Sequence, residues 1–196
     1  TISHSTFDNC SEKAIYLMNS DSKIISNTFK NLGSNYNIYI NGGFPLVANN
    51  LFTKSSPYSN YNNIYVYNSW GSINGNDTTW VRIINNEFSD NHYYGSGNPN
   101  MNDGSGEHIY IFNLRHIKIS GNNFHNNTGH QYRVAFLQSV EGASIIKNNK
   151  IYNNSFDVPY DYQGVINIYG TYGNYNFEIK NNEIYNEFTI NNLFLF

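Results

Sequence analysis

Short runs of alternating apolar and polar residues recur along the whole chain, and turn-forming residues separate them. The most regular unit is apolar-x-x-Asn-x-Phe/Ile, as in Ile24-Asn27-Phe29 and Ile83-Asn86-Phe88. Further copies are Val47-Asn50-Phe52, Ile119-Asn122-Phe124, Ile146-Asn149-Ile151, Ile179-Asn182-Ile184 and a degenerate first copy, Ile2-Ser5-Phe7. Apolar residues that recur with period 2 between asparagine, serine and glycine predict short β-strands.

The unit repeats at intervals that indicate a solenoid. From Ser5 to Asn182 the steps are 22, 23, 36, 36, 27 and 33 residues. A second alternating strand precedes most copies. These strands are Ile15-Tyr16-Leu17, Ile38-Tyr39-Ile40, Ile64-Tyr65-Val66 and Ile109-Tyr110-Ile111, with weaker versions at Val134-Ala135-Phe136 and Ile166-Asn167-Ile168. The shortest steps predict the basic coil, and the longer ones contain insertions.

A parallel β-helix accounts for this pattern. Its coils stack at about 4.8 Å, so equivalent residues of successive coils lie above one another. The repeated asparagine can then hydrogen-bond along the stack at a bend, while the Phe and Ile positions form an inward apolar stack. No single coil buries its own core, so stacking provides the stability. An array of amphipathic helices is excluded because the apolar period is 2 rather than 3.6.

Composition supports an all-β chain and excludes several classes of protein. The 196 residues include 38 asparagines and 22 isoleucines; 13% are charged and 17% are aromatic, which argues against disorder. The single Cys10 excludes a disulfide scaffold and a thiolate metal cage. No apolar run approaches the ~18 residues of a membrane helix. The net charge of −3 gives no strong attraction to nucleic acid.

The strings "IYL…IISNTFKN", "VRIINNEFSDN" and "IKISGNNFHNN" resemble the right-handed parallel β-helix repeat of pectate-lyase-like proteins. The Asn- and Tyr-rich composition is most similar to adhesin-like surface proteins of methanogenic archaea and gut bacteria. The resemblance implies one right-handed β-helix domain of about seven coils over residues 1–196, an extracellular or cell-surface location, and neighbouring β-helix coils or domains in a longer chain. The superfamily also includes enzymes, so the fold does not decide the function.

The alternation predicts an outward ladder of tyrosines. If Ile15, Ile38, Ile64 and Ile109 point inward, the residue that follows each of them points outward. The predicted tyrosine ladder is Tyr16, Tyr39, Tyr65 and Tyr110. Two positions further along, the predicted outward residues are Met18, Tyr67, Phe112, Leu137 and Tyr169. Tyrosine offers an apolar ring and a hydroxyl to a sugar, so the predicted carbohydrate-binding residues are Tyr16, Tyr39, Tyr65, Tyr67 and Tyr110. The alternative is that tyrosine simply suits strands, and that the insertions fold over it.

The longest insertion, "SDNHYYGSGNPNMNDGSGEH", lies between Phe88 and Ile109 and contains acidic residues but no Lys or Arg. It fails the EF-hand template, which requires Gly at the sixth position, where this loop has Asp103. No metal ligand and no cofactor is therefore assigned, and a calcium site of looser geometry stays open.

Charged residues in and after the longest insertion suggest an alternative, enzymatic function. We expect His108 and Arg133, which precede Ile109 and Val134, to occupy equivalent places on successive coils. A cluster of carboxylates, histidine and arginine could support acid–base chemistry on a sugar. The candidates are Asp103, Glu107, His108, His130, Arg133 and Asp161. The acidic constellation of pectate-lyase-like enzymes is missing, because the corresponding strand positions hold Tyr, Asn and Gly.

The sequence therefore favours a non-enzymatic, adhesin-like β-helix module that contacts a polysaccharide or surface glycan through the tyrosine ladder and long loops. The alternative is a carbohydrate-active enzyme, a polysaccharide lyase or glycoside hydrolase, with a groove near His108 and Arg133. Solvated loop charges would explain the same residues without catalysis.

Overall fold

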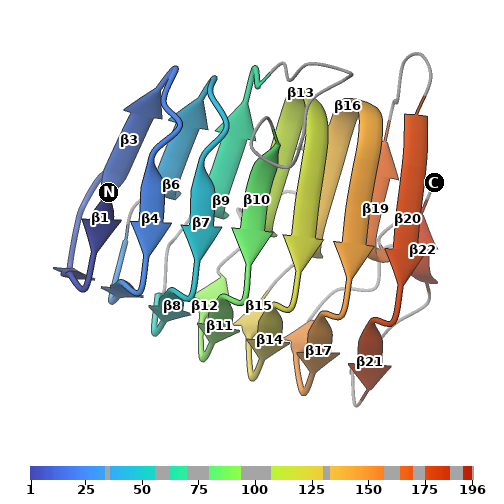
Figure 1. The fold of residues 1–196 in the computed structure, drawn as a ribbon. Coiled ribbons are helices and arrows are strands. Elements are labelled where there is room, and N and C mark those ends of the chain that lie inside the picture. Colours follow the sequence, from blue (N-terminus) through green and yellow to red (C-terminus); the bar gives the residue numbers. More distant parts are fainter. Residues whose placement is uncertain are drawn as a thin grey trace, which may run out of the picture.

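The structure is a computed structural model, and it describes residues 1–33, 36–55, 62–69, 80–93, 107–129, 133–156, 164–169, 175–185 and 192–195. Regular structure in this part of the chain consists of β-strands, and all the strand pairs are parallel. Successive strands of each sheet come from successive coils, which lie side by side from the N-terminal to the C-terminal end (Figure 1). The expected all-β parallel helix is confirmed.

Three long faces surround the core, and each is named here after its first strand. The β1 face contains β1 (Ile2–Ser3), β4 (Lys23–Ile25), β7 (Leu46–Ala48), β10 (Val81–Ile84), the second halves of β13 (Glu107–Ser120) and β16 (Arg133–Lys147), and β20 (Tyr175–Lys180). The β2 face contains β2 (Thr6–Asp8), β5 (Thr28–Lys30), β8 (Leu51–Thr53), β11 (Glu87–Ser89), β14 (Asn123–His125), β17 (Lys150–Tyr152) and β21 (Glu183–Tyr185). Its seven strands confirm the expected number of coils.

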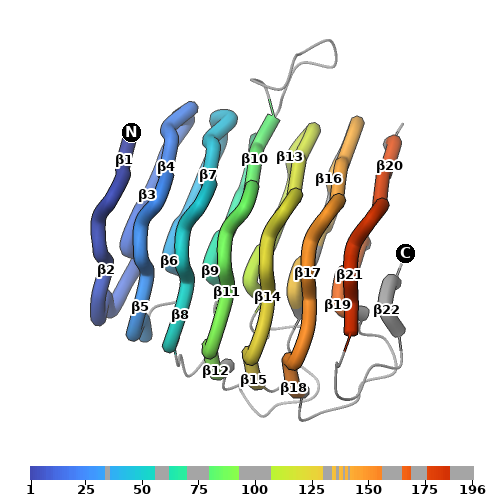
Figure 2. The backbone as a smooth tube through the Cα atoms, turned by 60° about the horizontal axis from the view of Figure 1, so that its bottom comes forward, coloured from blue at the N-terminus to red at the C-terminus, as the bar shows by residue number. Residues whose placement is uncertain are grey.

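The β3 face contains β3 (Ile15–Met18), β6 (Tyr36–Asn41), β9 (Asn62–Tyr67), the first halves of β13 and β16, β19 (Gly164–Tyr169) and β22 (Asn192–Leu195). A separate three-stranded sheet follows the β2 face and contains β12 (His92–Tyr93), β15 (Thr128–Gly129) and β18 (Ser155–Phe156). The backbone tube shows these windings as a row of similar turns (Figure 2). In β13 the register shifts between Arg115 and Ile117, where the strand passes from the β3 face to the β1 face.

Buried asparagines connect the coils at the bend between the β1 and β2 faces. The asparagine ladder consists of Asn27, Asn50, Asn86, Asn122, Asn149 and Asn182. Each Nδ2 donates to the Oδ1 of the next asparagine at 2.9–3.1 Å. The same Oδ1 accepts the backbone N–H of the preceding ladder residue, as Asn86 does from Asn50 at 3.0 Å. The ladder therefore satisfies backbone groups that have no strand partner at the bend.

A second ladder, which the repeat template did not predict, lies at the bend after the β2 face. There the backbone N–H of Ser55 donates to Asn91 Oδ1. Asn91 Nδ2 donates to Asn127 Oδ1, and Asn127 Nδ2 donates to Asn154 Oδ1, both at 2.9 Å. The signal was available in the sequence, because each of these residues follows a ladder asparagine by five positions.

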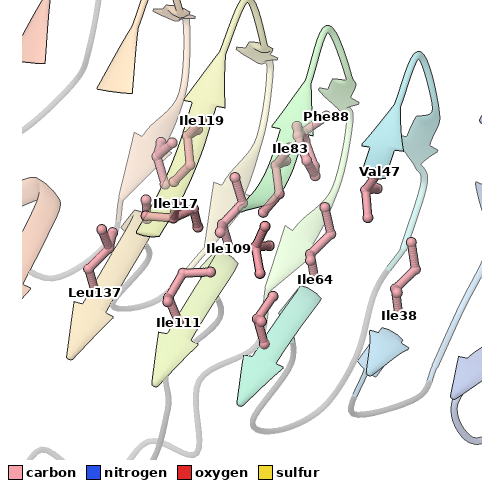
Figure 3. Packing of buried hydrophobic residues seen from close by; sticks show 14 of the residues in the cluster. Ile38, Val47, Ile64, Ile83, Phe88, Ile109, Ile111, Ile117, Ile119 and Leu137 are labelled. Atoms are coloured by element: carbon pink, nitrogen blue, oxygen red, sulfur yellow. The ribbon is translucent and has the colours of Figure 1, made fainter. Parts of the chain in front are cut away.

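The interior between the faces is filled by stacked apolar side chains. Phe7, Phe29, Phe52, Phe88 and Phe124 stack with ring centroids 4.6–4.8 Å apart. Isoleucines of the β3 and β1 faces point toward one another across the core, as Ile64 and Ile83 do in Figure 3. Each coil thus contributes one layer to a continuous core, as expected for a solenoid.

Candidate functional site

The tyrosine ladder lies on the outside of the β3 face. Tyr16, Tyr39, Tyr65 and Tyr110 are paired in register across β3, β6, β9 and β13. Their ring centroids are 5.3, 5.0 and 5.2 Å apart in sequence order. The column continues as Phe136 and Asn167 on the next two coils. The structure therefore brings the predicted residues together as one row over four coils.

The rings of the ladder stack on one another, so they cover each other's faces. The last two ring pairs are within 15° of parallel, whereas Tyr16 is tilted by 32° against Tyr39. Ring edges and hydroxyl groups, rather than apolar faces, are therefore directed to the outside along most of the row. Tyr16 is the open member, with 50% of its surface exposed, while Tyr39, Tyr65 and Tyr110 are half-buried.

Burial raises the pKa of two phenol groups of the ladder, Tyr65 and Tyr39, and neighbouring phenols add to both shifts. A neutral hydroxyl can donate one hydrogen bond and accept others. Tyr110 uses its hydroxyl to donate to Gln138 Oε1 of the next coil at 3.1 Å. The row can therefore offer both donors and acceptors to a polar ligand.

Tyr36 and Lys13 extend the ladder at its first two coils, and the sequence pattern did not predict either contact. The Tyr36 ring lies 5.3 Å from Tyr39 and 4.9 Å from Tyr65. Lys13 Nζ lies 6.0, 5.9 and 5.4 Å from the ring centroids of Tyr16, Tyr36 and Tyr39. Strict alternation from the inward Ile38 would place Tyr36 inside. Alternation does not hold at this point, because Asn37 and Ile38 are both buried although they are adjacent.

The second outer column contains Met18, Asn41, Tyr67, Phe112 and Gln138. The backbone of Tyr169 pairs in register with Gln138 on the next coil. Tyr67 stacks on Phe112 at 5.5 Å. The prediction that Leu137 belongs to this column was wrong, because Leu137 pairs with Ile111 and is fully buried. The run Val134-Ala135-Phe136-Leu137 is apolar throughout, so alternation did not determine which side chains face the core.

The predicted cluster around His108 differs from the groove expected from the sequence. His108 is fully buried and its ring lies 4.9 Å from Phe88 and 5.4 Å from Phe124. Asn63 Nδ2 lies 2.6 Å from His108 Nδ1. Burial lowers the pKa of His108 well below its ordinary value. The expectation that His108 lines a groove was therefore wrong: in this structure a polysaccharide has no access to the ring.

The other residues of the predicted cluster are only partly described. Glu107 is fully buried, and its charge contributes to raising the pKa of Tyr36, after burial itself. Arg133 pairs in register with Glu107, so the expected equivalence of Arg133 and His108 was wrong by one residue. Asp103, His130 and Asp161 lie outside the described residues.

The described part of the chain contains no group of three His, Cys, Asp or Glu side chains that could hold a metal ion. The acidic loop in which a calcium site stayed open lies outside this part except at its two ends. None of the described residues forms a helix with the length and apolar character needed to cross a membrane.

A second aromatic row, missed from the sequence, lies on the outside of the β2 face. His125, Tyr152 and Tyr185 stack with ring centroids 5.1 Å apart and planes within 7° of parallel. His125 Nε2 lies 3.2 Å from Glu87 Oε1. The row resembles the tyrosine ladder in spacing but belongs to another face, so it provides a matched surface for comparison.

Comparison with known proteins adds one finding to this geometry. A family model described as right handed beta helix region matches residues 1–191, which is nearly the whole chain. Neither the curated proteins nor the solved structures with which the chain was compared gave a match. The matched region covers both aromatic rows and the interior around His108.

Proposed function

The chain belongs to the right-handed beta helix family, and we propose that it is a non-enzymatic, adhesin-like module of the cell surface or extracellular space. Its ligand would be a polysaccharide or surface glycan that contacts the tyrosine ladder. The family includes both enzymes and surface proteins, so the proposal rests on the ladder rather than on the fold.

The observation that carries the proposal is the continuity of the ladder. Tyr16, Tyr39, Tyr65 and Tyr110 follow one another at 5.0–5.3 Å over four coils. Met18, two residues after Tyr16 and the first member of the second outer column, has 58% of its surface exposed. An aromatic row with one open end provides apolar edges and hydroxyl groups at regular intervals. A glycan offers the matching alternation of C–H groups and hydroxyls.

The test is a glycan-array screen with conservative variants of the ladder. Tyr39→Phe combined with Tyr65→Phe removes two hydroxyls but preserves the stacking, so the fold is retained. We expect this double variant to lose binding about tenfold, the effect of one or two lost hydrogen bonds. Tyr16→Ala, at the open end of the row, is expected to weaken binding by a similar factor. Circular dichroism checks that each variant is folded.

The matched control is Tyr152→Ala combined with Tyr185→Ala, which removes aromatic rings of the same kind from the β2 face. Unchanged binding in this control and loss in the ladder variants would support the proposal. If the ladder variants bind every glycan as tightly as the unmutated protein, the ladder is not the binding surface. If the unmutated protein releases shortened products from a bound polysaccharide, the carbohydrate-active enzyme would be the better account.

A further inference from the structure

Asn37, Asn63 and His108 form a chain of buried polar side chains inside the core at the start of the β3 face, called the interior amide chain here. Asn37 Nδ2 donates to Asn63 Oδ1 at 2.6 Å, and Asn63 Nδ2 lies 2.6 Å from His108 Nδ1. All three side chains have no solvent-exposed surface. The same column continues as Val134 and Val165, which are also buried.

The chain has a direction, and this direction fixes the state of the histidine. Because the Asn63 amide nitrogen can only donate, His108 Nδ1 must accept, so the neutral ring carries its proton on Nε2. At the other end, Asn37 Oδ1 has no hydrogen-bond partner among the described residues, although it is buried. A buried acceptor without a donor is costly and calls for a physical explanation.

The geometry points to a proton-binding site inside the core: when His108 takes up a second proton on Nδ1, the amides of Asn63 and Asn37 turn over together and the chain reverses its direction. The proton comes from a hydronium ion of the acidified solvent: its O–H bond breaks as the new N–H bond forms at the Nδ1 lone pair, and water is left behind. Nδ1–H of the imidazolium then donates to Asn63 Oδ1, and Asn63 Nδ2 donates to Asn37 Oδ1. Asn37 Oδ1 thereby gains a donor, while Asn37 Nδ2, which donated to Asn63 before, takes the place that Oδ1 held.

The side chains around the His108 ring favour reversal of the two amides over formation of a simple ion pair. On β11 and β14 the rings of Phe88 and Phe124 face His108, while Glu87 and His125 of the same strands pair with each other on the outside. On β13 itself the neighbouring Glu107 acts on Tyr36. On β6 and β9 the groups that face the ring side are the two amides. The side chain of Arg133 on β16 lies outside the described part.

Burial lowers the pKa of His108, so protonation needs acid. The reversal of the Asn63 amide offsets part of the free-energy cost of a buried charge, because a hydrogen bond to a charged group is stronger than one to a neutral group.

A second buried histidine provides the contrast. His116 Nδ1 accepts the backbone N–H of Ala143 at 3.0 Å. A backbone N–H cannot turn over, so a proton on His116 Nδ1 would face another donor. The two histidines of one protein thus differ in whether their hydrogen-bond partner can reverse.

The experiment is an NMR titration of the isotopically labelled full chain, from neutral pH to the onset of acid unfolding. It follows the ring signals of both histidines and the side-chain NH₂ signals of Asn37 and Asn63. We expect His108 to be protonated in the folded protein, with both NH₂ signals shifting at the same midpoint. In the variant Asn63→Leu the proton affinity of His108 should fall about tenfold, or about one pH unit, because the charged ring loses its acceptor. His116 should be unaffected by this substitution.

Three results would overturn the inference. The first is protonation of folded His108 while the Asn37 and Asn63 amide signals stay in place. The second is the same His108 midpoint in the folded Asn63→Leu variant. The third is acid unfolding of the unmutated protein while His108 is still neutral. If Asn63→Leu does not fold, the amide signals of the unmutated protein decide the question alone.

Discussion

At the scale of single residues, four of the bends before the β2 face place two neighbouring asparagines in different roles, at 49–50, 85–86, 148–149 and 181–182. Asn85 adopts a φ of 53° and is exposed, and Asn148 and Asn181 share this conformation at φ 56° and 53°. Asn86 follows it, is 1% exposed and hydrogen-bonds to both neighbouring coils. Asparagine tolerates the left-handed region better than most residues, and its amide pairs well when buried. The two roles together explain why the chain is so rich in asparagine.

We expect Asn86→Ala to lower the free energy of unfolding by about 3 kcal/mol or more. The substitution removes the acceptor of the Asn50 backbone N–H and side chain, and the donor to the Val47 carbonyl. The matched control is Asn85→Gly, which keeps the left-handed conformation that Gly121 has in the same column. It should change stability by less than about 0.5 kcal/mol. Urea denaturation of both variants measures the difference; equal effects would show that the ladder does not stabilise the bend.

At the scale of strands, register was only partly predictable from the sequence. Alternation correctly placed Tyr16, Tyr39, Tyr65 and Tyr110 in one column, because each lies between two large apolar residues. It failed for β16, where four consecutive apolar residues allow either face inward. It failed again at the start of the β3 face, where His108 and Ile109 are both buried. Register there is set by the pairing of β13 with β9 and β16, which a local pattern does not contain.

Gly142 shows how a strand depends on its neighbour. It has a φ of 71°, and a Cβ at this position would lie 2.6 Å from His116 Cε1 and 2.9 Å from its Nδ1. We expect Gly142→Ala to lower the free energy of unfolding by about 2–3 kcal/mol, from backbone strain and the displaced His116–Ala143 hydrogen bond. Gly33→Ala is the control, since nothing lies within 4 Å of its added Cβ. Thermal or urea unfolding measures both; similar stability of the two variants would contradict this account of the β13–β16 pair.

At the scale of the whole molecule, the protein is a row of coils that each touch only their neighbours. The insertions change the length of a coil without changing its place in the asparagine ladder, since Asn50 and Asn86 are 36 residues apart yet directly paired. Stability should therefore be close to a sum over coils and their interfaces. The repeat, the coil number and the ladder could be predicted from the sequence because they depend on spacing alone. The depth of His108 could not, because it depends on the path of the chain at a corner.

Removal of residues 51–86 tests this additivity. The deletion joins Asn50 to Glu87 and takes out one 36-residue repeat. It should also place Asn37 next to His108 and Tyr39 next to Tyr110, so both columns stay continuous. We expect a folded protein whose urea m-value is lower by about one part in seven, because less surface is exposed on unfolding. A deletion longer by one residue should misalign β11 and prevent folding. Failure of the first deletion to fold would contradict the additive description.

The direction of the asparagine ladder has a consequence for the way the protein is made. In every pair the donor belongs to the earlier coil and the acceptor to the later one. During translation the asparagine of a newly formed bend therefore has no acceptor until the ribosome has synthesised the next coil. At about 5–20 residues per second, the 36 residues between Asn50 and Asn86 take about 2–7 seconds to synthesise. The rate of translation thus sets how long the polar groups of each new bend lack their hydrogen-bond partners. Slow codons within a long insertion would prolong this period and with it the opportunity for misfolding.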